Sequence, residues 1–442
     1  MTRVRPTPTR AIRGPLLSYS GDPFQHGIRD TRLYEPDAIV AMAAGRITHV
    51  GPASVVRSQL PPRVQVVDYG RDALITAGFI DCHVHFPQTQ IIGAGGEQLL
   101  DWLNKHTYVA EQRFADAKLA RAVAKIFLRE SLRNGVTTSA VHCTVHPQSV
   151  DALFEEAEKL GLRTIAGKVL MDRNAPRALL DTARTGYDQS KALIRRWHGR
   201  GRLLYAITPR FAATSSPGQL EAAGTLKNEH PDCFVQSHIA ESKQEMGWIR
   251  TLFPERKGYL DVYDHYGLLG RRAIYGHGIW LTERELLRCH QTGTAIAHCP
   301  TSNFFLGSGC LDVGNAVRRT RPVRVGLATD VGAGTSFSML QTMGEAFKAA
   351  QLHGRPLAAA HAFYLATRGA ARALYLDDTV GSIAPGMEAD LVVLDLKSTP
   401  LIAYRMRYAD DLDQALFVQM TLADDRAVRA TYVAGRKLYQ RA

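Results

Sequence analysis

Short apolar segments alternate with helical segments through the middle of this chain. Most of the apolar segments are bounded by Gly, Pro or polar residues, as buried parallel strands usually are. The strand candidates are Ile80–His85, Val136–Val141, Thr164–Val169, Leu203–Thr208, Phe234–His238, Ala273–His277, Ala295–Cys299 and Val323–Asp330. Repeated strand–helix units of this size favour an α/β fold of the (β/α)8 TIM barrel type, with a doubly wound open sheet as the alternative.

Two segments between the strand candidates have apolar residues at helical spacing, over 119–127 and 150–157. Asn134-Gly135 is expected to end the first helix and Gly161 the second, because glycine commonly follows the last helical turn. The barrel is favoured over the open sheet because the candidate metal-ligating and catalytic residues all lie at the carboxyl ends of strand candidates. Active sites of barrel enzymes are found at that end.

The two ends of the chain are β-rich. The candidate strands there are Ala38–Met42, Ile47–Val50, Val64–Asp68, Leu391–Leu394 and Ala427–Val433. We expect both ends to pair into one small composite β-sandwich, with residues 1–77 as its N-terminal part, 78–384 as the barrel and 385–442 as its C-terminal part. Met1–Arg13 is expected to be a short frayed tail, because Gly14-Pro15 follows it.

Composition is that of a soluble globular protein, with 45% hydrophobic and 22% charged residues among 442 and no apolar stretch long enough for a membrane span. The net charge is +12, but the basic residues are scattered and no aromatic-interleaved basic motif occurs, which argues against nucleic acid as a partner. The six cysteines form no C-x-x-C pair and no secretory signal is evident, so reduced thiols in a cytoplasmic enzyme are expected.

His83 and His85 end an apolar strand candidate one residue apart. Alternate residues of a strand point to the same face, so the two imidazoles are expected to project together. Two neutral imidazoles aimed at one point suit a divalent transition metal. An isolated H-x-H is a weak signal, since histidines also serve as hydrogen-bonded core residues.

Further candidate ligands, His238, His277 and Asp330, end later strand candidates. A carboxylate at the end of a buried strand needs a partner such as a metal. Glu241 follows His238 by three residues and is placed for acid–base work, although a glutamate at a helix N-terminus is the common alternative. The series makes metal-assisted hydrolysis the leading hypothesis.

Other residues of the same types have weaker contexts. His298 and Cys299 precede a turn and are expected to be structural. Trp102 and Trp280 either stack on an aromatic substrate or simply pack. Surface or core roles are expected for His106, His142, His146, His230, His290, His353 and His361.

Four motifs together resemble the amidohydrolase superfamily in their order and strand-end placement. They are Gly78-Phe79-Ile80-Asp81-Cys82-His83-Val84-His85, Gln236-Ser237-His238-Ile239-Ala240-Glu241, Gly276-His277 and Thr329-Asp330. Within this superfamily, further segments of the chain are similar to the guanine deaminase family. These are His85-Phe86-Pro87-Gln88, Leu99-Leu100-Asp101-Trp102-Leu103, Ala110-Glu111-Gln112-Arg113-Phe114, Thr208-Pro209-Arg210-Phe211, Cys299-Pro300-Thr301-Ser302-Asn303 and Asp330-Val331-Gly332.

The resemblance implies a (β/α)8 barrel with a β-sandwich, one zinc ion per subunit, a small-molecule purine base as substrate and often a homodimer. It implies deamination of guanine to xanthine and ammonia. The implied metal ligands are His83, His85, His238 and Asp330. The implied catalytic residues are Glu241, His277 and Asp330. The implied substrate-binding residues are His85, Phe86, Pro87, Gln88, Trp102, Arg210, Phe211, His238, His277 and Asp330.

The sequence leaves several alternatives open. Iron(II) and manganese(II) accept the same ligands as zinc. Val109 stands where the family pattern has proline and Trp280 where it has histidine, which puts fine substrate preference in question.

Another deaminase of the superfamily, acting on 8-oxoguanine, a triazine or adenosine, or a cyclic amide hydrolase is the runner-up. A non-catalytic scaffold ranks lower because every expected ligand is present. The H-x-E and P-C-x-x-C elements of cytidine-type deaminases are absent.

Overall fold

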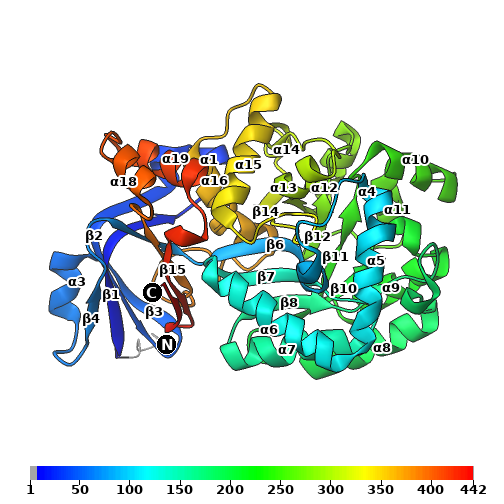
Figure 1. Cartoon of the computed structure of the whole chain (residues 1–442), viewed down its shortest axis with the longest axis horizontal. Coiled ribbons are helices and arrows are strands. Elements are labelled where there is room, and N and C mark those ends of the chain that lie inside the picture. Colours follow the sequence, from blue (N-terminus) through cyan, green and yellow to red (C-terminus); the bar gives the residue numbers. More distant parts are fainter. Residues whose placement is uncertain (1–6, 442) are drawn as a thin grey trace.

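The computed structural model describes residues 7–441. Two bodies of secondary structure lie side by side, a helix-covered parallel sheet and a separate sheet built from both chain ends (Figure 1). The helix-covered sheet carries the predicted site residues.

A nearly closed barrel of parallel strands forms the larger body. Within the described residues its eight-strand path runs β14-β13-β12-β11-β10-β8-β7-β6, and β9 pairs with β10. The strands are β6 (Phe79–His85), β7 (Val136–His142), β8 (Arg163–Gly167), β9 (Val169–Leu170), β10 (Leu203–Pro209), β11 (Phe234–Ile239), β12 (Ala273–His277), β13 (Ala295–His298) and β14 (Arg324–Leu327). The two ends of this path meet where the Asp330 N–H donates to the His83 carbonyl at 3.0 Å and the His85 N–H to the Val331 carbonyl at 2.9 Å. The predicted TIM barrel is therefore confirmed.

Helices between the strands cover the outside of the barrel (Figure 1). They are α4 (Leu99–Trp102), α5 (Tyr108–Gln112), α6 (Ala117–Arg133), α7 (Pro147–Leu160), α8 (Ala183–Trp197), α9 (Pro217–Glu229), α10 (Lys243–Leu252), α11 (Tyr259–His265), α12 (Glu283–Thr292), α13 (Pro300–Phe305), α14 (Val313–Ala316), α15 (Met339–Leu352), α16 (Ala359–Leu365) and α17 (Arg368–Ala373).

Local sequence sets the ends of these helices. The Ser242 and Thr282 hydroxyls each accept a backbone N–H three residues on, from Glu245 and Glu285, and so cap α10 and α12. As predicted, α6 ends before Asn134 and α7 at Gly161, which has a φ of 71° that glycine adopts without a steric penalty. At the far end of the barrel α17 packs against β6, β13 and β14 among small side chains, and Cys82 is buried there.

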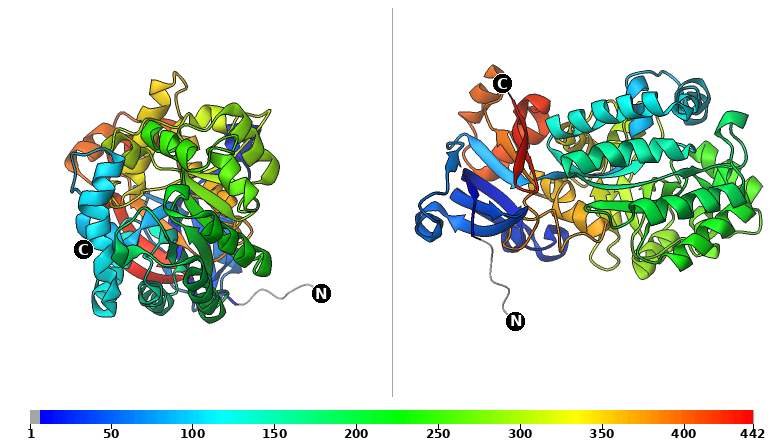
Figure 2. Two further views of the ribbon diagram at one scale, coloured as in Figure 1. Left: turned by 90° about the vertical axis from the view of Figure 1, so that its right-hand side faces the viewer. Right: turned by 90° about the horizontal axis from the view of Figure 1, so that it is seen from below.

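Both chain ends contribute to the second sheet, as predicted. The strands are β1 (Arg10–Tyr19), β2 (Arg32–Ala43), β3 (Arg46–Pro52), β4 (Val66–Asp68), β5 (Ala73–Ala77), β15 (Leu391–Asp395), β16 (Val428–Val433) and β17 (Arg436–Gln440). The order is β17-β16-β15-β5-β1-β2-β3, so β5 joins the two ends of the chain through antiparallel pairing with β15. The blue and red strands lie next to one another in the right-hand view of Figure 2. Buried side chains from both ends form one apolar cluster, including Val40, Ile75 and Val393.

The structure corrects two expectations about the ends. Residues Arg10–Arg13 are not part of a frayed tail, because β1 begins at Arg10 and pairs with β2, whereas residues 1–6 lie outside the described part. The stretch after residue 385 is not purely β, because α18 (Pro400–Met406) and α19 (Leu412–Leu422) interrupt it. Helix α19 packs against α15 and α16, so this stretch also covers the barrel. Two short helices, α1 (Pro23–His26) and α2 (Ile28–Thr31), follow β1, and α3 (Ala53–Gln59) follows β3.

No helix in residues 7–441 combines the length and apolar character needed to cross a membrane. All six cysteines fall within this range and are free thiols, as expected.

Candidate active site

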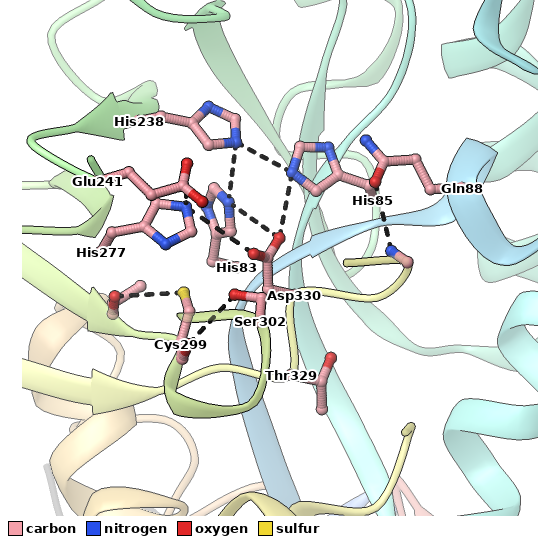
Figure 3. Close-up of polar contacts among 12 residues, drawn as sticks. His83, His85, Gln88, His238, Glu241, His277, Cys299, Ser302, Thr329 and Asp330 are labelled. Atoms are coloured by element: carbon pink, nitrogen blue, oxygen red, sulfur yellow. Dashed lines mark hydrogen bonds and ion pairs between the residues drawn. The ribbon is translucent and has the colours of Figure 1, made fainter. Parts of the chain in front are cut away.

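Three histidines converge at the carboxyl ends of β6 and β11. The Nε2 atom of His238 lies 3.2 Å from Nε2 of His83 and 3.1 Å from Nε2 of His85. Asp330, after β14, places Oδ1 at 3.5 Å from His83 Nε2 and at 3.4 Å from His85 Nε2 (Figure 3). All four side chains predicted as metal ligands therefore meet at one place, and each is buried or nearly so.

The protonation of this cluster leaves lone pairs facing one another. Nδ1 of His238 lies 2.6 Å from the Arg210 carbonyl oxygen, which only accepts, so Nδ1 carries the proton and Nε2 is a lone pair. Burial, reinforced by the surrounding imidazoles, holds the pKa of His83 and of His238 well below the usual histidine value, so both rings are neutral. Neutral imidazole nitrogens and a carboxylate converging in this way fit a divalent transition metal.

Asp330 is ionised in this setting. Burial raises the pKa of its carboxyl, but hydrogen bonding to His85 and the charge of His277 lower it more, and the net shift is downward. The backbone at Asp330 has a φ of 51°, and His277 at the end of β12 has a φ of 74°. Non-glycine residues rarely adopt this region, and strain of this kind is found where a site fixes side-chain direction.

The residue beside His277 makes room for the imidazole cluster. A Cβ added at Gly276 would lie 2.8 Å from Cε1 of the His83 ring, closer than real Cβ contacts. Glycine at this position of β12 therefore allows the His83 imidazole to lie against that strand.

Glu241 and His277 form a second, coupled pair beside the cluster. Nε2 of His277 is 3.4 Å from Oε2 of Glu241 and 3.8 Å from Oδ2 of Asp330, and Nδ1 of His277 contacts Oδ1 of Asn303 at 2.9 Å. Burial raises the pKa of Glu241 to about 8, against the opposing effect of His277, so its carboxyl retains a proton near neutral pH. Burial lowers the pKa of His277, but Glu241 and Asp330 raise it more, and the net shift is upward.

A hollow opens onto these groups. Its lining combines apolar and polar side chains: His85, Gln88, Leu99, Trp102, Leu103, Arg210, Phe211, His238, Glu241, Glu245, His277, Leu306, Asp330 and Ala333. Apolar walls with a few convergent polar groups are typical of a small-molecule site.

Gln88 and Arg210 are held at the hollow by Glu111. The Arg210 guanidinium donates from Nη1 to both Glu111 oxygens, at 2.7 and 3.0 Å, and the Gln88 amide donates to Oε1 of Glu111 at 3.1 Å. The Gln88 amide oxygen accepts the Gly332 N–H at 3.3 Å. These contacts fix both side chains at the wall of the hollow.

Two of the side chains predicted to contact substrate do not line the hollow. The Phe86 ring instead packs against Phe114 and Phe127, with centroids 5.4 and 6.2 Å apart, and Pro87 is buried beside it in a 3-10 helix over Phe86–Ile91. The tryptophans also differ. Trp102 lines the hollow, whereas Trp280 lines a neighbouring one and donates from Nε1 to the Ser308 carbonyl.

Sequence reasoning missed several residues that the fold brings to the cluster. His142, expected to have a surface or core role, ends β7 with its ring centroid 4.6 Å from that of His83. Glu111 lies within a motif of the family resemblance that assigns it no role. Asn303 orients His277 from α13, and Asp81 accepts the Thr329 N–H at 3.0 Å beside Asp330. These residues reach the cluster through packing between segments that are distant in the sequence. His142 alone had a sequence signal, because it ends an apolar strand as the predicted ligands do.

Expected structural residues also lie close by. Cys299 groups with His277 and Asp330, with potential ligand atoms within 4.8 Å of one another, and all three are buried. His298 is fully buried, and burial lowers its pKa to about 3. Val109, one of the two departures from the family pattern, is 57% exposed on α5 and does not line the hollow.

Comparison with known proteins agrees with this architecture. The model of the amidohydrolase family matches residues 74–438, and the chain belongs to the amidohydrolase family of hydrolases. Enzymes of this family are generally metal-dependent, and the clustered His and Asp side chains are possible ligands.

Similar proteins within the family are guanine deaminases. The guanine deaminase of Escherichia coli strain K12 is 51% identical over 405 residues, which span 92% of each chain. A solved structure of E. coli guanine deaminase matches with a TM-score of 0.95 and 48% identity, covering 98% of this chain and 100% of that one. The structure of the guanine deaminase from C. acetobutylicum with guanine bound in its active site matches with a TM-score of 0.87 and 27% identity, covering 97% and 100% of the two chains.

Proposed function

We propose that this protein is a zinc-dependent guanine deaminase, which hydrolyses guanine to xanthine and ammonia. The observation that carries the proposal is the convergence of three imidazoles and Asp330 next to the Glu241–His277 pair, in a hollow that also presents Gln88 and Arg210. The similarity to guanine deaminases over nearly the whole chain supports the substrate.

In this proposal His83, His85, His238 and Asp330 hold one divalent cation. When bound, the cation supplies Lewis acidity that lowers the pKa of a water molecule toward neutrality. Zinc is the proposed metal, and the donor set also accepts iron(II) or manganese(II).

The chain's own residues manage the protons of the reaction. Deamination requires that the attacking water lose a proton and that a ring nitrogen of guanine gain one. Asp330 is ionised and accepts the water proton at its carboxylate. Glu241, which holds a proton near neutral pH, donates it from its carboxyl to the ring nitrogen so that the amino-bearing carbon becomes electrophilic.

His277 stabilises charge at the reacting carbon. Asn303 fixes the ring through Nδ1, so Nε2 points toward Glu241 and Asp330. While Glu241 is protonated, the charge of Asp330 favours a protonated ring that donates a hydrogen bond there. The second proton of the attacking water then returns to Glu241, and Asp330 passes the first to the amino group. Ammonia leaves, and both carboxyl groups regain their starting protonation states.

Arg210 and Gln88 orient the purine. A guanidinium fork donates to the purine carbonyl, and an amide both donates and accepts. Trp102 and Phe211 provide flat apolar surfaces at the same hollow. His85, His238, His277 and Asp330 also line it and would contact the reacting end of the base.

The remaining proposals concern organisation and cellular role. We propose a homodimer, cytoplasmic and acting in purine catabolism, with the chain divided into residues 1–77, 78–384 and 385–442. The change of sheet between β5 and β6 supports the first boundary. Light scattering on the purified protein tests the proposed homodimer, and a monomeric mass would contradict it.

A substrate panel tests the proposed function. Zinc-loaded protein is incubated with guanine, adenine, cytosine, 8-oxoguanine and guanosine, and ammonia and the product base are measured. We expect guanine to be turned over at the highest kcat/KM. If another base is turned over at a higher kcat/KM, the protein is still a hydrolase but guanine is not its preferred substrate.

A further inference from the structure

His142 lies at the carboxyl end of β7, directly behind the proposed metal ligands. Its side chain is fully buried, and its ring centroid is 4.6 Å from that of His83, 4.7 Å from that of His85 and 4.9 Å from that of His238. It does not line the hollow, whereas His85 and His238 do. His142 therefore contacts the imidazole cluster from the side away from the substrate.

Both ring nitrogens of His142 lack a hydrogen-bond partner among residues 7–441. Buried polar atoms in proteins nearly always have a partner, because desolvation without one costs about 1–3 kcal/mol. His238 follows that pattern, since its Nδ1 contacts the Arg210 carbonyl oxygen. The unpartnered His142 nitrogens instead lie among other imidazoles, where a cation is the natural partner.

Two of the groups of potential ligand atoms in the described chain share His83. One nitrogen from each of His83, His142 and His238 lies within 4.8 Å of the others, and so do atoms of His83, His85 and Asp330. The first set contains only neutral imidazoles and the second contains a carboxylate.

We propose that His142 is a further metal-ligating residue, which forms a second, all-imidazole ligand set with His83 and His238. This inference rests on the proposed metal centre. Because the sets share His83, they hold one ion in alternative positions, and the imidazole set retains zinc when Asp330 does not ligate. Three imidazoles suit zinc, copper and nickel.

Zinc affinity in the absence of Asp330 tests the proposal. Zinc dissociation constants are measured by competition with a chromophoric chelator for Asp330→Ala, Asp330→Ala/His142→Phe and Asp330→Ala/His298→Phe. Phenylalanine keeps a ring of similar size and removes both nitrogens. His298 is the matched control because it is also fully buried with both ring nitrogens unpartnered, but it belongs to none of the potential ligand groups in the described chain.

We expect Asp330→Ala to retain one zinc per chain, His142→Phe to weaken its binding by at least about tenfold, and His298→Phe to leave it within about twofold. Equal affinities with and without His142, or complete loss of zinc in Asp330→Ala, would overturn the proposal. Far-ultraviolet circular dichroism confirms folding, and Asp330→Asn replaces Asp330→Ala throughout if the alanine variant does not fold.

Cobalt(II) provides a second readout that does not depend on catalysis. In the Asp330→Ala background the visible absorption of bound cobalt should change on His142→Phe and not on His298→Phe. Guanine turnover by the unmodified protein is measured separately. If it is observed while His142 has no effect on metal binding, this inference fails and the proposed function stands.

Discussion

Arg210 and Glu111 form an ion pair that is almost completely removed from solvent, with Nη1 and Oε2 2.7 Å apart and exposed side-chain fractions of 2% and 0%. Both strand β10 and helix α5 are thereby tied to the same hollow, since Arg210 follows β10 and Glu111 lies on α5. A buried charge without its partner is costly, so this pair couples the stability of the fold to the recognition of substrate.

Glu111→Gln should therefore destabilise the protein by about 3–5 kcal/mol and raise KM for guanine, because it leaves the Arg210 charge buried and unpaired. Urea unfolding and steady-state kinetics measure the two effects. Glu158→Gln is the control, since its pair with Arg200 is about half exposed and should contribute less than about 1 kcal/mol. Similar losses of stability in both variants would contradict this account of the buried pair.

Glu241→Gln should lower kcat by about 10²–10⁴-fold while leaving the fold intact, because an amide cannot relay the proton. Glu255→Gln, on the exposed surface after α10, should retain full activity. Rates are measured at saturating guanine, and folding is checked by thermal unfolding. A Glu241→Gln variant with nearly unchanged kcat would remove Glu241 from the mechanism.

The pH dependence of turnover should reflect the protonated form of Glu241. Because burial raises the pKa of this carboxyl to about 8, the acid is available below that pH and is lost as the pH rises through it. We expect kcat/KM for guanine to fall on the alkaline side of a profile measured from pH 6 to 10. A rate that continues to increase through pH 9 would be incompatible with Glu241 as the acid.

Glu388 should stabilise the protein in a pH-dependent manner. It accepts from Arg163 at 2.6 Å and from Arg202 at 2.6 Å, which joins β8 and the segment before β10 to the C-terminal part of the chain. Burial raises the pKa of Glu388, but the two arginines lower it more, so the folded-state pKa lies below the usual value of about 4.5. The stabilisation is therefore fully present above that value and is lost as the pH falls through the folded-state pKa.

Glu388→Gln should reduce the free energy of unfolding by about 1–3 kcal/mol at pH 7, and the difference from the unmodified protein should shrink toward pH 3. Urea unfolding at a series of pH values provides the measurement. Glu345→Gln removes an exposed pair with Lys348 and should change stability little at any of them. If Glu388→Gln lowers the free energy of unfolding by the same amount at every pH, its effect comes from packing and not from the charge of Glu388.

The two tryptophans considered for stacking should differ in their contribution to substrate binding. Trp102→Ala should raise KM for guanine, because this ring lines the hollow, whereas Trp280→Ala should change it by less than about threefold. Steady-state kinetics on both variants make the comparison. A larger effect at Trp280 would extend the substrate site into the neighbouring hollow.

The sequence predicted the barrel well because each buried parallel strand is a local apolar run that ends at a recognisable boundary. The same logic identified His83, His238 and Asp330, since strand ends that share an edge of a sheet are brought together by the topology itself. Strand β1 was missed because Gly14-Pro15 interrupts its pattern, and the structure accommodates this pair with a register shift between Gly14 and Leu16.

The other misses concern contacts between segments far apart in the chain. His142 ends a strand as His238 does, but its sequence gives no sign that β7 places it against His83. Glu111 lies on a short helix whose role depends on Arg210, 99 residues away. Helices α18 and α19 were overlooked because the flanking strands dominated the apolar pattern, and their position is set by packing on α15 and α16.

Zinc titration of guanine turnover tests the central claim most directly. Protein stripped with a chelator is incubated with guanine, and xanthine formation is followed as zinc is added back. The account predicts little activity in the stripped protein and a rise to a plateau at one zinc per chain, with one ammonia released per xanthine. Turnover that is independent of metal, or no turnover of guanine at any zinc concentration, would contradict it.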